Sequence, residues 1–431
     1  MSCTLSSLCS AILRHLVPVR TFRAKLDSLY EKNWVENSID FKKQLLIDVS
    51  VIIAHDARTG IQRFVRAIVQ ELLKTPPDGT DVRLVYATRT CGYHYAKTEF
   101  CLLSESWLIS PSTAKIRVVA GDIFLALDLT ANILPSHLTE IIGWKSRGAS
   151  IHIVVYDLLP VLFPKWFSKK LNRNFLRWLH AVAIVANSAV CISKTVGTDL
   201  TRCIAVIHGL KEGTIRVSSV RPGSDIEATF PSKGLPVDFD KIMLSISLRP
   251  NIMMVGTLEP RKGHFEVVKA FEELWNSNCN VNLIIVGKPG WQTATLQKYL
   301  KSHPKKGVFL YWFDNASDEM LDRLYQVCTA VIVASHAEGY GLPVAEAIRY
   351  GKPVLARDLP VFQEFSQSGV TYFRANYKLC DEIKNWLATL LSTPFQMRGQ
   401  IQKWEDTTSE LLEGIGLSRK EGIGIEMHAS G

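Results

Sequence analysis

Short apolar runs alternate with amphipathic stretches along most of the chain, beginning near residue 43. Short continuous apolar runs are typical of strands buried on both faces, and apolar residues with the helical period are typical of helices. The pattern predicts strands at 45–52, 82–86, 123–127, 151–156 and 189–192, and helices at 61–73, 137–145 and 166–183. Strands that alternate with helices in this way predict a parallel sheet with helices on both faces.

The alternation stops in a segment rich in proline and glycine and then begins again. Pro231, Gly234 and Pro236 mark this segment as a linker. After it, strands are expected at 252–256, 283–287, 308–312, 330–335 and 354–356, and helices at 264–275, 296–300, 318–328, 359–365, 379–391 and 395–412. The pattern therefore predicts two doubly wound, Rossmann-like α/β domains that face each other across a cleft. Ligands in such folds bind at the carboxyl ends of the strands.

These boundaries divide the chain into consecutive parts. We expect an extension at 1–40, a first domain at 41–225, a linker at 226–248, a second domain at 249–392, a C-terminal helix at 393–416 and a disordered tail at 417–431. The extension mixes apolar and basic residues, which fit either a packed or frayed segment or an amphipathic segment that touches a membrane surface. We expect neither a secretory signal nor a transmembrane helix, because no apolar run is long enough.

The motif at 338–346 holds most of the candidate chemistry. Glu338 and Glu346 stand on either side of a Gly-x-Gly turn, directly after an apolar run. Pro343 is suited to the first turn of a helix, where its missing N–H costs nothing. A strand, a glycine turn and a helix start direct free N–H groups and the positive end of the helix dipole at one point, which suits a phosphate. The two glutamates are then expected close to the rest of the same ligand.

Arg261 and Lys262 form a second candidate site, between the expected strand at 252–256 and the expected helix at 264–275. Cations at a helix start cost about 0.3–1 kcal/mol unless an anion is bound beside them. For the pair alone, a solvated basic turn is the simpler interpretation. With the glutamate motif in the same domain we expect phosphate binding, because the arginine offers a planar fork and the lysine a compact charge. Together they would stabilise a departing diphosphate.

The first domain contributes weaker candidates. Gly60 opens the first helix, where a glycine lets the backbone approach a ligand closely. Asp157 ends a buried strand, and it fits a contact to the acceptor or to a transferred group as well as it fits a cap on the following loop. His180 lies inside a long helix, where a packed histidine is the simpler interpretation. A catalytic role stays open for Asp157 and for His180.

Composition adds a preference for anionic partners. Of the 431 residues, 47% are apolar and 21% are charged, and the net charge is +9. Such a balance favours nucleotide phosphates, acidic lipid head groups or nucleic acid. Nucleic acid is not the expected partner, because the basic residues are dispersed and no module of stacking aromatic residues accompanies them. The nine cysteines lack Cys-x-x-Cys spacing, which predicts reduced, buried thiols in a cytosolic protein.

Together these motifs resemble the family-four retaining glycosyltransferases, which have the two-domain GT-B fold. The resemblance covers residues 43–415 and rests on Gly-Thr-Leu-Glu-Pro-Arg-Lys-Gly at 256–263, Val-Gly-Lys at 286–288, the glutamate pair and Ala-Arg-Asp-Leu-Pro-Val-Phe at 356–362. In the first domain, the motifs at 56–63, 155–160 and 191–194 are similar to the mannosyltransferases that build O-antigen and related polysaccharides. There are two departures: many members carry two glycines where only Gly60 is present, and a basic residue where Thr257 stands.

The resemblance implies a nucleotide-diphospho-sugar donor held mainly by the second domain. The implied donor-binding residues are Arg261 and Lys262 for the pyrophosphate, Glu346 for the ribose hydroxyls, and Gly60, Gly339, Gly341 and Leu342 for backbone contacts. Glu338 and Asp157 are the implied catalytic residues, as stabilising groups rather than an acid/base pair. No cofactor and no metal are implied, and Asp238 and Asp240 match an Asp-x-Asp metal motif only superficially, since they lie in the linker.

The expected activity is transfer of a sugar from a nucleotide-diphospho-sugar to a glycan or lipid-linked oligosaccharide in polysaccharide synthesis. GDP-mannose is the expected donor, and the expected location is the cytoplasm, with peripheral contact to the cytoplasmic face of a membrane as one possibility. Two alternatives stay open. One is another nucleotide-sugar enzyme of the same fold, an epimerase or a phosphorylase, and the other is a non-catalytic protein that binds nucleotides or nucleic acid.

Overall fold

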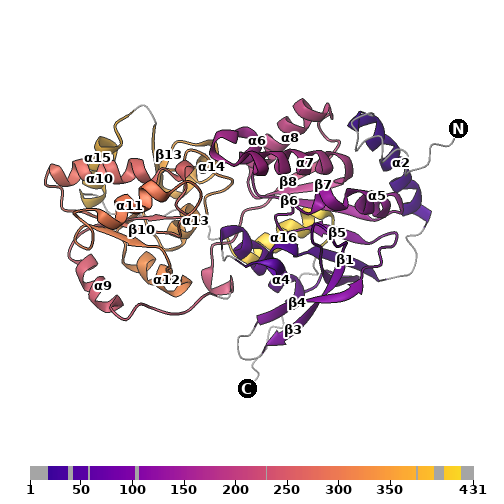
Figure 1. The fold of residues 1–431 in the computed structure, drawn as a ribbon, viewed down its shortest axis with the longest axis horizontal. Helices are drawn as coiled ribbons and strands as arrows, with labels where there is room; N and C mark the ends of the chain where they lie inside the picture. Colours follow the sequence, from indigo (N-terminus) through magenta and orange to yellow (C-terminus); the bar gives the residue numbers. More distant parts are fainter. Residues whose placement is uncertain are drawn as a thin grey trace, which may run out of the picture.

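The computed structural model describes residues 18–36, 42–56, 59–101, 106–229, 231–374, 377–392 and 402–418. Two α/β domains lie side by side, each built around one sheet (Figure 1). This arrangement confirms the predicted fold class. Most of the expected extension and tail, and the first part of the expected C-terminal helix, lie outside the described residues.

The sheet of the first domain has the order β4-β3-β2-β1-β5-β6-β7-β8. In chain order its strands are β1 (Lys43–Asp48), β2 (Thr80–Tyr86), β3 (His94–Cys101), β4 (Ser106–Lys115), β5 (Ile123–Ala126), β6 (Ser150–Val155), β7 (Ser188–Cys191) and β8 (Arg216–Ser219). In this order the strands from β2 to β8 pair in parallel. At the other edge, β3 pairs antiparallel with both β2 and β4. We did not predict this ribbon of β3 and β4, because its strands contain no apolar run longer than three residues.

Helices cover both faces of this sheet (Figure 1). They are α2 (Val19–Glu36), α3 (Ser50–Ala54), α4 (Gly60–Lys74), α5 (Leu138–Ser146), α6 (Leu159–Leu162), α7 (Lys169–Val185) and α8 (Lys194–His208), with the 3-10 turns η1 (Leu134–His137) and η2 (Pro164–Trp166). The strand expected at 45–52 is wrong in its second half. The Asp48 carboxylate accepts a hydrogen bond from the Ser50 N–H at 2.8 Å, and the chain turns there into α3.

The extension contains a helix that packs on the first domain. Helix α2 contacts α5 and α7, and its Phe22 and Leu26 are buried. Its Arg23 is also buried and donates hydrogen bonds to the carbonyls of Ala183 at 3.0 Å and Ala186 at 2.7 Å, at the end of α7. For the described part of the extension, the packed alternative is therefore the observed one.

The sheet of the second domain is parallel throughout its described strands, in the order β11-β10-β9-β12-β13-β14. These strands are β9 (Asn251–Val255), β10 (Asn282–Val286), β11 (Leu310–Phe313), β12 (Ala330–Val333), β13 (Val354–Arg357) and β14 (Val370–Phe373). Because the chain runs outward from β9 through β11 and then returns to β12, the strand order reverses between β9 and β12. A crevice opens at such a point, at the carboxyl ends of the strands.

The helices of the second domain include one in the expected linker. They are α9 (Phe239–Ser247), α10 (His264–Asn276), α11 (Ala294–Ser302), α12 (Asp318–Val327), α13 (Leu342–Arg349), α14 (Pro360–Gln363) and α15 (Leu379–Ser392), with the 3-10 turn η4 (Pro260–Lys262) after β9. Phe239 and Ile246 of α9 are buried in the core of this domain. The segment at 226–248 thus contains a helix, and Phe239 and Ile246 attach this helix to the core of the second domain.

The chain finally returns to the first domain. Helix α16 (Trp404–Ile415), yellow in Figure 1, packs on α4, β7 and β8. Its Trp404 ring meets the Phe64 ring edge-on, with centroids 5.7 Å apart. The described cysteines with assigned burial are unpaired thiols, of which Cys191, Cys203, Cys328 and Cys380 are buried and Cys91 is exposed. Within the described ranges, the helices lack the length and apolar content that crossing a bilayer requires.

Candidate functional site

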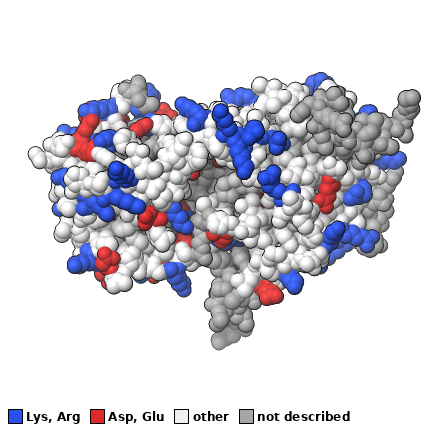
Figure 2. Space-filling view, viewed as in Figure 1, with Lys and Arg blue, Asp and Glu red and all other residues white. Residues whose placement is uncertain are grey.

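A cavity of about 440 Å³ lies between the two domains, at the carboxyl ends of β9, β10, β11 and β12. The space-filling view shows the hollow between the domains from one side (Figure 2). Its volume is in the range typical of small-molecule sites. The predicted site residues all line it: Gly60, Asp157, Arg261, Lys262, Glu338, Gly339, Gly341, Leu342 and Glu346. His180 lies elsewhere, with its ring 5.2 Å from that of His208 between centroids.

At one end of the cavity, two cations enclose a buried carboxylate. The loop after β9 carries Arg261 and Lys262 in η4, and the loop after β12 carries Glu338. Lys262 forms an ion pair with one oxygen of Glu338, and Arg261 lies 3.2 Å from the other. Arg261 also pairs with Glu259 at 2.8 Å. The strand order brings these loops together, because β9 and β12 are neighbours although 70 residues or more separate their motifs.

This environment keeps Glu338 ionised. Burial alone would raise the pKa of its carboxyl, but the charges of Lys262 and Arg261 outweigh burial and bring the pKa down to about 2. The hydroxyl of Ser335 donates a further hydrogen bond to the carboxylate at 2.6 Å. Glu338 is therefore an anion near neutral pH, which fits a charge-stabilising role and does not fit a proton donor.

The glycine turn lets the first domain approach closely. A side chain on Gly339 would place its Cβ 2.2 Å from the carbonyl oxygen of Tyr156, at the end of β6. The hydroxyl of Ser193, also in the first domain, donates to the Gly339 carbonyl at 2.7 Å. Gly341 has a φ of +106° and caps α13, so Pro343 falls in the first helical turn as predicted. A glycine turn is thus required here by the contact between domains as well as by any ligand.

Gly60 and Asp157 meet the second domain from the other side. A Cβ at Gly60 would lie 2.8 Å from the end of the Leu342 side chain, so a larger residue would require that side chain to shift. Asp157 accepts a hydrogen bond from the Leu159 N–H at 3.0 Å, which is the capping role weighed above. Burial raises the pKa of its carboxyl, and Arg261 partly offsets the increase. Because Asp157 also lines the cavity, the cap and a contact to a ligand are compatible.

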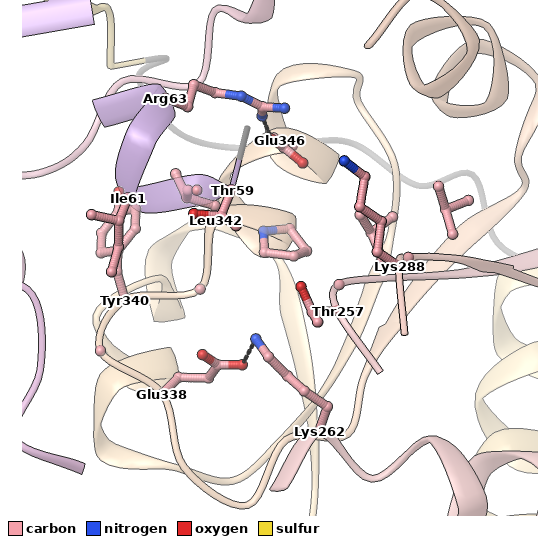
Figure 3. Close-up of a pocket in the computed structure, with 18 of the residues that line it drawn as sticks. Thr59, Ile61, Arg63, Thr257, Lys262, Lys288, Glu338, Tyr340, Leu342 and Glu346 are labelled. Atoms are coloured by element: carbon pink, nitrogen blue, oxygen red, sulfur yellow. Dashed lines mark hydrogen bonds and ion pairs between the residues drawn. The ribbon is translucent and has the colours of Figure 1, made fainter. Parts of the chain in front are cut away.

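At the other end of the cavity, Glu346 is bound from both domains. Its side chain is buried on α13 and accepts a hydrogen bond from the Tyr325 hydroxyl at 2.8 Å. Its second oxygen pairs with Arg63, which reaches across from α4 (Figure 3). Arg63 also pairs with Asp318 at 2.8 Å, and the Ser232 N–H donates to Asp318 at 2.8 Å. Arg63 is thus a cation shared by two carboxylates of the opposite domain.

Sequence reasoning missed Arg63, although it ends the motif at 56–63. A capping box of Thr59 and Gln62 starts α4 at Gly60. Arg63 therefore lies about one turn from Gly60 and shares the side of the helix that faces the cavity. That spacing was a usable signal, but a basic residue on a helix has too many ordinary roles to be selected without the opposing carboxylates.

Lys288 is a second cation that sequence reasoning left without a role. It follows β10 and points into the cavity (Figure 3). Thr257 stands where many members of the family that the sequence resembles carry a basic residue, and it lines the same cavity. Lys288 therefore supplies to this cavity a positive charge that Thr257 does not. Asp314 and Ser317 line the end beyond β11. Among the described residues, no three His, Cys, Asp or Glu side chains gather in a way that would hold a metal ion.

Comparison with known proteins finds relatives for most of the chain. The family model described as "Glycosyl transferases group 1" matches residues 242–403. The serotype-specific mannosyltransferase WbdA of Escherichia coli is 38% identical over 405 residues, which are 91% of this chain and 48% of WbdA. The chain thus spans about half the length of the curated relatives that it matches first.

Two solved structures share the two-domain arrangement. HepE of Anabaena in complex with UDP-glucose has a TM-score of 0.54 at 14% identity and covers 85% of this chain and 94% of its own. Sucrose-phosphate synthase of Thermosynechococcus elongatus has a TM-score of 0.55 at 15% identity and covers 86% of this chain and 94% of its own. At this level of identity the likeness establishes the common fold.

Proposed function

We propose that the chain is a glycosyltransferase of polysaccharide synthesis, because its residues 242–403 match the family model of the glycosyl transferases of group 1. It transfers a sugar from a nucleotide-diphospho-sugar, held in the cavity, to a glycan or lipid-linked oligosaccharide. The similarity to the O-antigen chain mannosyltransferase B of Escherichia coli, 28% identical over 210 residues, supports this acceptor class. No cofactor takes part in the proposed reaction.

One observation carries the proposal: a single cavity brings together groups that suit each part of the donor. Arg261 and Lys262 suit a diphosphate, which carries opposite charge and planar acceptor oxygens. Glu346 lies in the same cavity, where its carboxylate can accept hydrogen bonds from ribose hydroxyls. The end lined by Lys288 and Asp314 then receives the base. Glu338 and Asp157 remain beside the transferred sugar.

The ion pairs around Glu338 suggest how the reaction is stabilised. Glu338 serves there as counterion to Arg261 and Lys262. When the diphosphate arrives it shares these cations, and they stabilise the negative charge that grows on it as the bond to the sugar breaks. The carboxylates of Glu338 and Asp157 stabilise the positive charge that develops on the sugar. Retention of configuration, with attack on the face from which the diphosphate leaves, requires no protein nucleophile.

GDP-mannose is the proposed donor. The mannosyltransferase relatives support the sugar. For the base, Asp314 lines the far end of the cavity, and a carboxylate only accepts hydrogen bonds. Guanine offers a ring N–H and an amino group side by side, whereas uracil offers one N–H between two carbonyls that a carboxylate would repel. This difference favours guanine.

The test is binding followed by turnover. The melting temperature of the protein is measured with GDP, UDP and ADP, and transfer from GDP-mannose to a mannose-containing acceptor is then assayed with and without EDTA. We expect GDP alone to raise the melting temperature clearly, and transfer to persist in EDTA. A response to none of the three nucleotides would refute the donor site. Release of free mannose isomers or of sugar phosphate instead of a glycan would favour an epimerase or a phosphorylase.

A further inference from the structure

The outer face of α7 and the turn before it form an exposed surface that is entirely basic in its charges. From Leu158 to Thr198 the sequence contains no acidic residue. The basic face, as we name it, consists of exposed side chains on η2 and α7: Lys165, Lys169, Lys170, Arg173 and Arg177. The four on α7 recur with the helical period and therefore share one side of the helix. We propose that this basic face docks on an anionic lipid bilayer.

The basic face has no acidic partner in the described part of the protein, and the one contact that its charges make there is that of Lys165, whose Nζ lies 5.2 Å from the centroid of the Trp166 ring. Among the described residues, none of its five side chains forms an ion pair. Exposed arginines elsewhere do pair with nearby acids, as Arg202 does with Asp199 and Arg83 with Asp81. Like charges held close together repel, so folding alone gives no reason to gather them. A negatively charged partner does.

Apolar side chains on the same surface favour a lipid partner over a purely polar one. Leu176 is 45% exposed between Arg173 and Arg177, and Phe163 is 36% exposed just before η2. The opposite side of α7 is in the core of the domain, where Trp178 and Leu179 are buried. A helix with basic residues and exposed apolar residues on its free face matches the properties of segments that lie in a membrane interface.

The basic face borders the cavity between the domains. The Trp166 ring of η2 faces the ring of His336, in the loop just before Glu338, with centroids 6.1 Å apart. Figure 2 shows basic side chains gathered above the hollow, on the side of α6 and α7. Docking would therefore set the mouth of the cavity at the bilayer surface. If the proposed function is correct, that is where a lipid-linked acceptor presents its sugar.

Binding to vesicles tests the docking. The full chain is sedimented with vesicles of phosphatidylcholine alone and of phosphatidylcholine mixed with phosphatidylglycerol, at low and high salt. We expect binding only to the mixed vesicles, with a loss in high salt. Reversing two charges, in Lys169→Glu/Lys170→Glu or in Arg173→Glu/Arg177→Glu, should weaken this binding by more than about tenfold. Phe163→Ser/Leu176→Ser should weaken it less.

The matched control reverses two exposed lysines of the second domain, Lys298→Glu/Lys301→Glu, and should leave vesicle binding within about twofold of the parent, because net charge alone acts weakly at a distance. Equal loss in the control, or no preference for the mixed vesicles, would overturn the proposal, as would binding to RNA but not to vesicles. The GDP-dependent melting shift is measured on each variant. A retained shift with lost vesicle binding supports docking, and an absent shift in the parent chain counts against the proposed function alone.

Discussion

The two ends of the cavity balance their charges in different ways. At the end proposed to bind phosphate (the phosphate end), Arg261 and Lys262 pair with Glu338, and these residues all belong to the second domain. At the end proposed to bind ribose (the ribose end), the cation is Arg63 of the first domain, and its carboxylate partners Glu346 and Asp318 belong to the second. One network is complete within a domain, whereas the other exists only while the domains are together.

This difference implies that ligands at the two ends act differently on the contact between the domains. A ligand that reaches only the phosphate end competes with Glu338 and leaves the Arg63 contact between the domains untouched. A ligand that reaches Glu346 also touches Arg63, one of the groups that hold the domains together. Binding at that end is then linked to the position of the domains, and whatever moves the domains changes the affinity for the ligand. Inorganic pyrophosphate and GDP are probes for the two cases, since only GDP carries a ribose and a base.

The largest expected effect comes from removing Lys262, one of the two cations of the phosphate end. Lys262→Ala should lower kcat/KM for the donor by roughly 100-fold, because a hydrogen bond to a charged group contributes about 1.5–3 kcal/mol and the departing diphosphate depends on it. It should weaken GDP and pyrophosphate alike, as measured by calorimetry. Lys269→Ala is the matched control, since Lys269 pairs with Glu272 at the surface. A Lys262→Ala protein with GDP affinity near that of the parent would contradict the assignment.

The second-largest effect is expected from removing Arg63, which pairs with carboxylates of the opposite domain. Arg63→Ala leaves the buried carboxylate of Glu346 and the half-buried one of Asp318 without their cation, and we expect a loss of roughly 3 kcal/mol in the free energy of unfolding. The KM for the donor should rise by about 30-fold, while pyrophosphate affinity stays unchanged. Arg63→Lys keeps the charge and should recover part of both losses. Equal weakening of GDP and pyrophosphate would show that the two ends are not independent.

A smaller effect is expected at the ribose carboxylate itself. Glu346→Gln keeps the size of the side chain and removes its charge, so GDP affinity should fall by about tenfold and pyrophosphate affinity should not change. Tyr325 can still donate to the amide oxygen, which limits the loss of stability. Isothermal titration with both ligands measures the difference. Unchanged affinity for GDP would remove the ribose assignment and leave Glu346 as a partner of Arg63 alone.

The smallest effect concerns acid stability. The ordinary pKa of a glutamate is 4.5, and the pKa of Glu338 in the folded chain is lowered to about 2 by Lys262 and Arg261 against the effect of burial. A lowered folded-state pKa contributes stability above pH 4.5 that is lost as the pH falls toward 2. Glu338→Gln should therefore flatten the fall in unfolding free energy over this window. Urea denaturation at closely spaced pH values measures the slope, and an unchanged slope would contradict the environment described.

Much of the phosphate end could be predicted from the sequence. Arg261, Lys262 and Glu338 lie in short motifs directly after apolar runs, and a run that ends at a glycine loop places its neighbours at the carboxyl edge of a sheet. Their mutual contacts required more. Only the pairing of β9 with β12 brings the loops together, and this pairing depends on strand order. The short-range pattern indicated which residues bind, and the sheet decided what they contact.

The contacts of the ribose end, the β3–β4 ribbon and helix α9 could not be predicted from the local sequence pattern. Arg63 and Glu346 are 283 positions apart, and nothing in either segment indicates the other. The β3–β4 ribbon was missed because its strands lack a long apolar run, and α9 was missed because its proline- and glycine-rich surroundings are typical of a linker. For Arg63 and for α9, the decisive interactions come from residues distant in the chain.

The sequence by itself determined the two α/β domains, most of their strands and helices, and the motifs that line the cavity, because hydrophobic period and turn chemistry depend on neighbouring residues. Tertiary structure alone decided the order of the strands, the return of α16 to the first domain and the placement of Arg63 between two carboxylates. These features depend on packing between segments whose separation along the chain carries no signal. The motifs that line the cavity are therefore predictable from the local sequence, whereas their arrangement around the cavity is not.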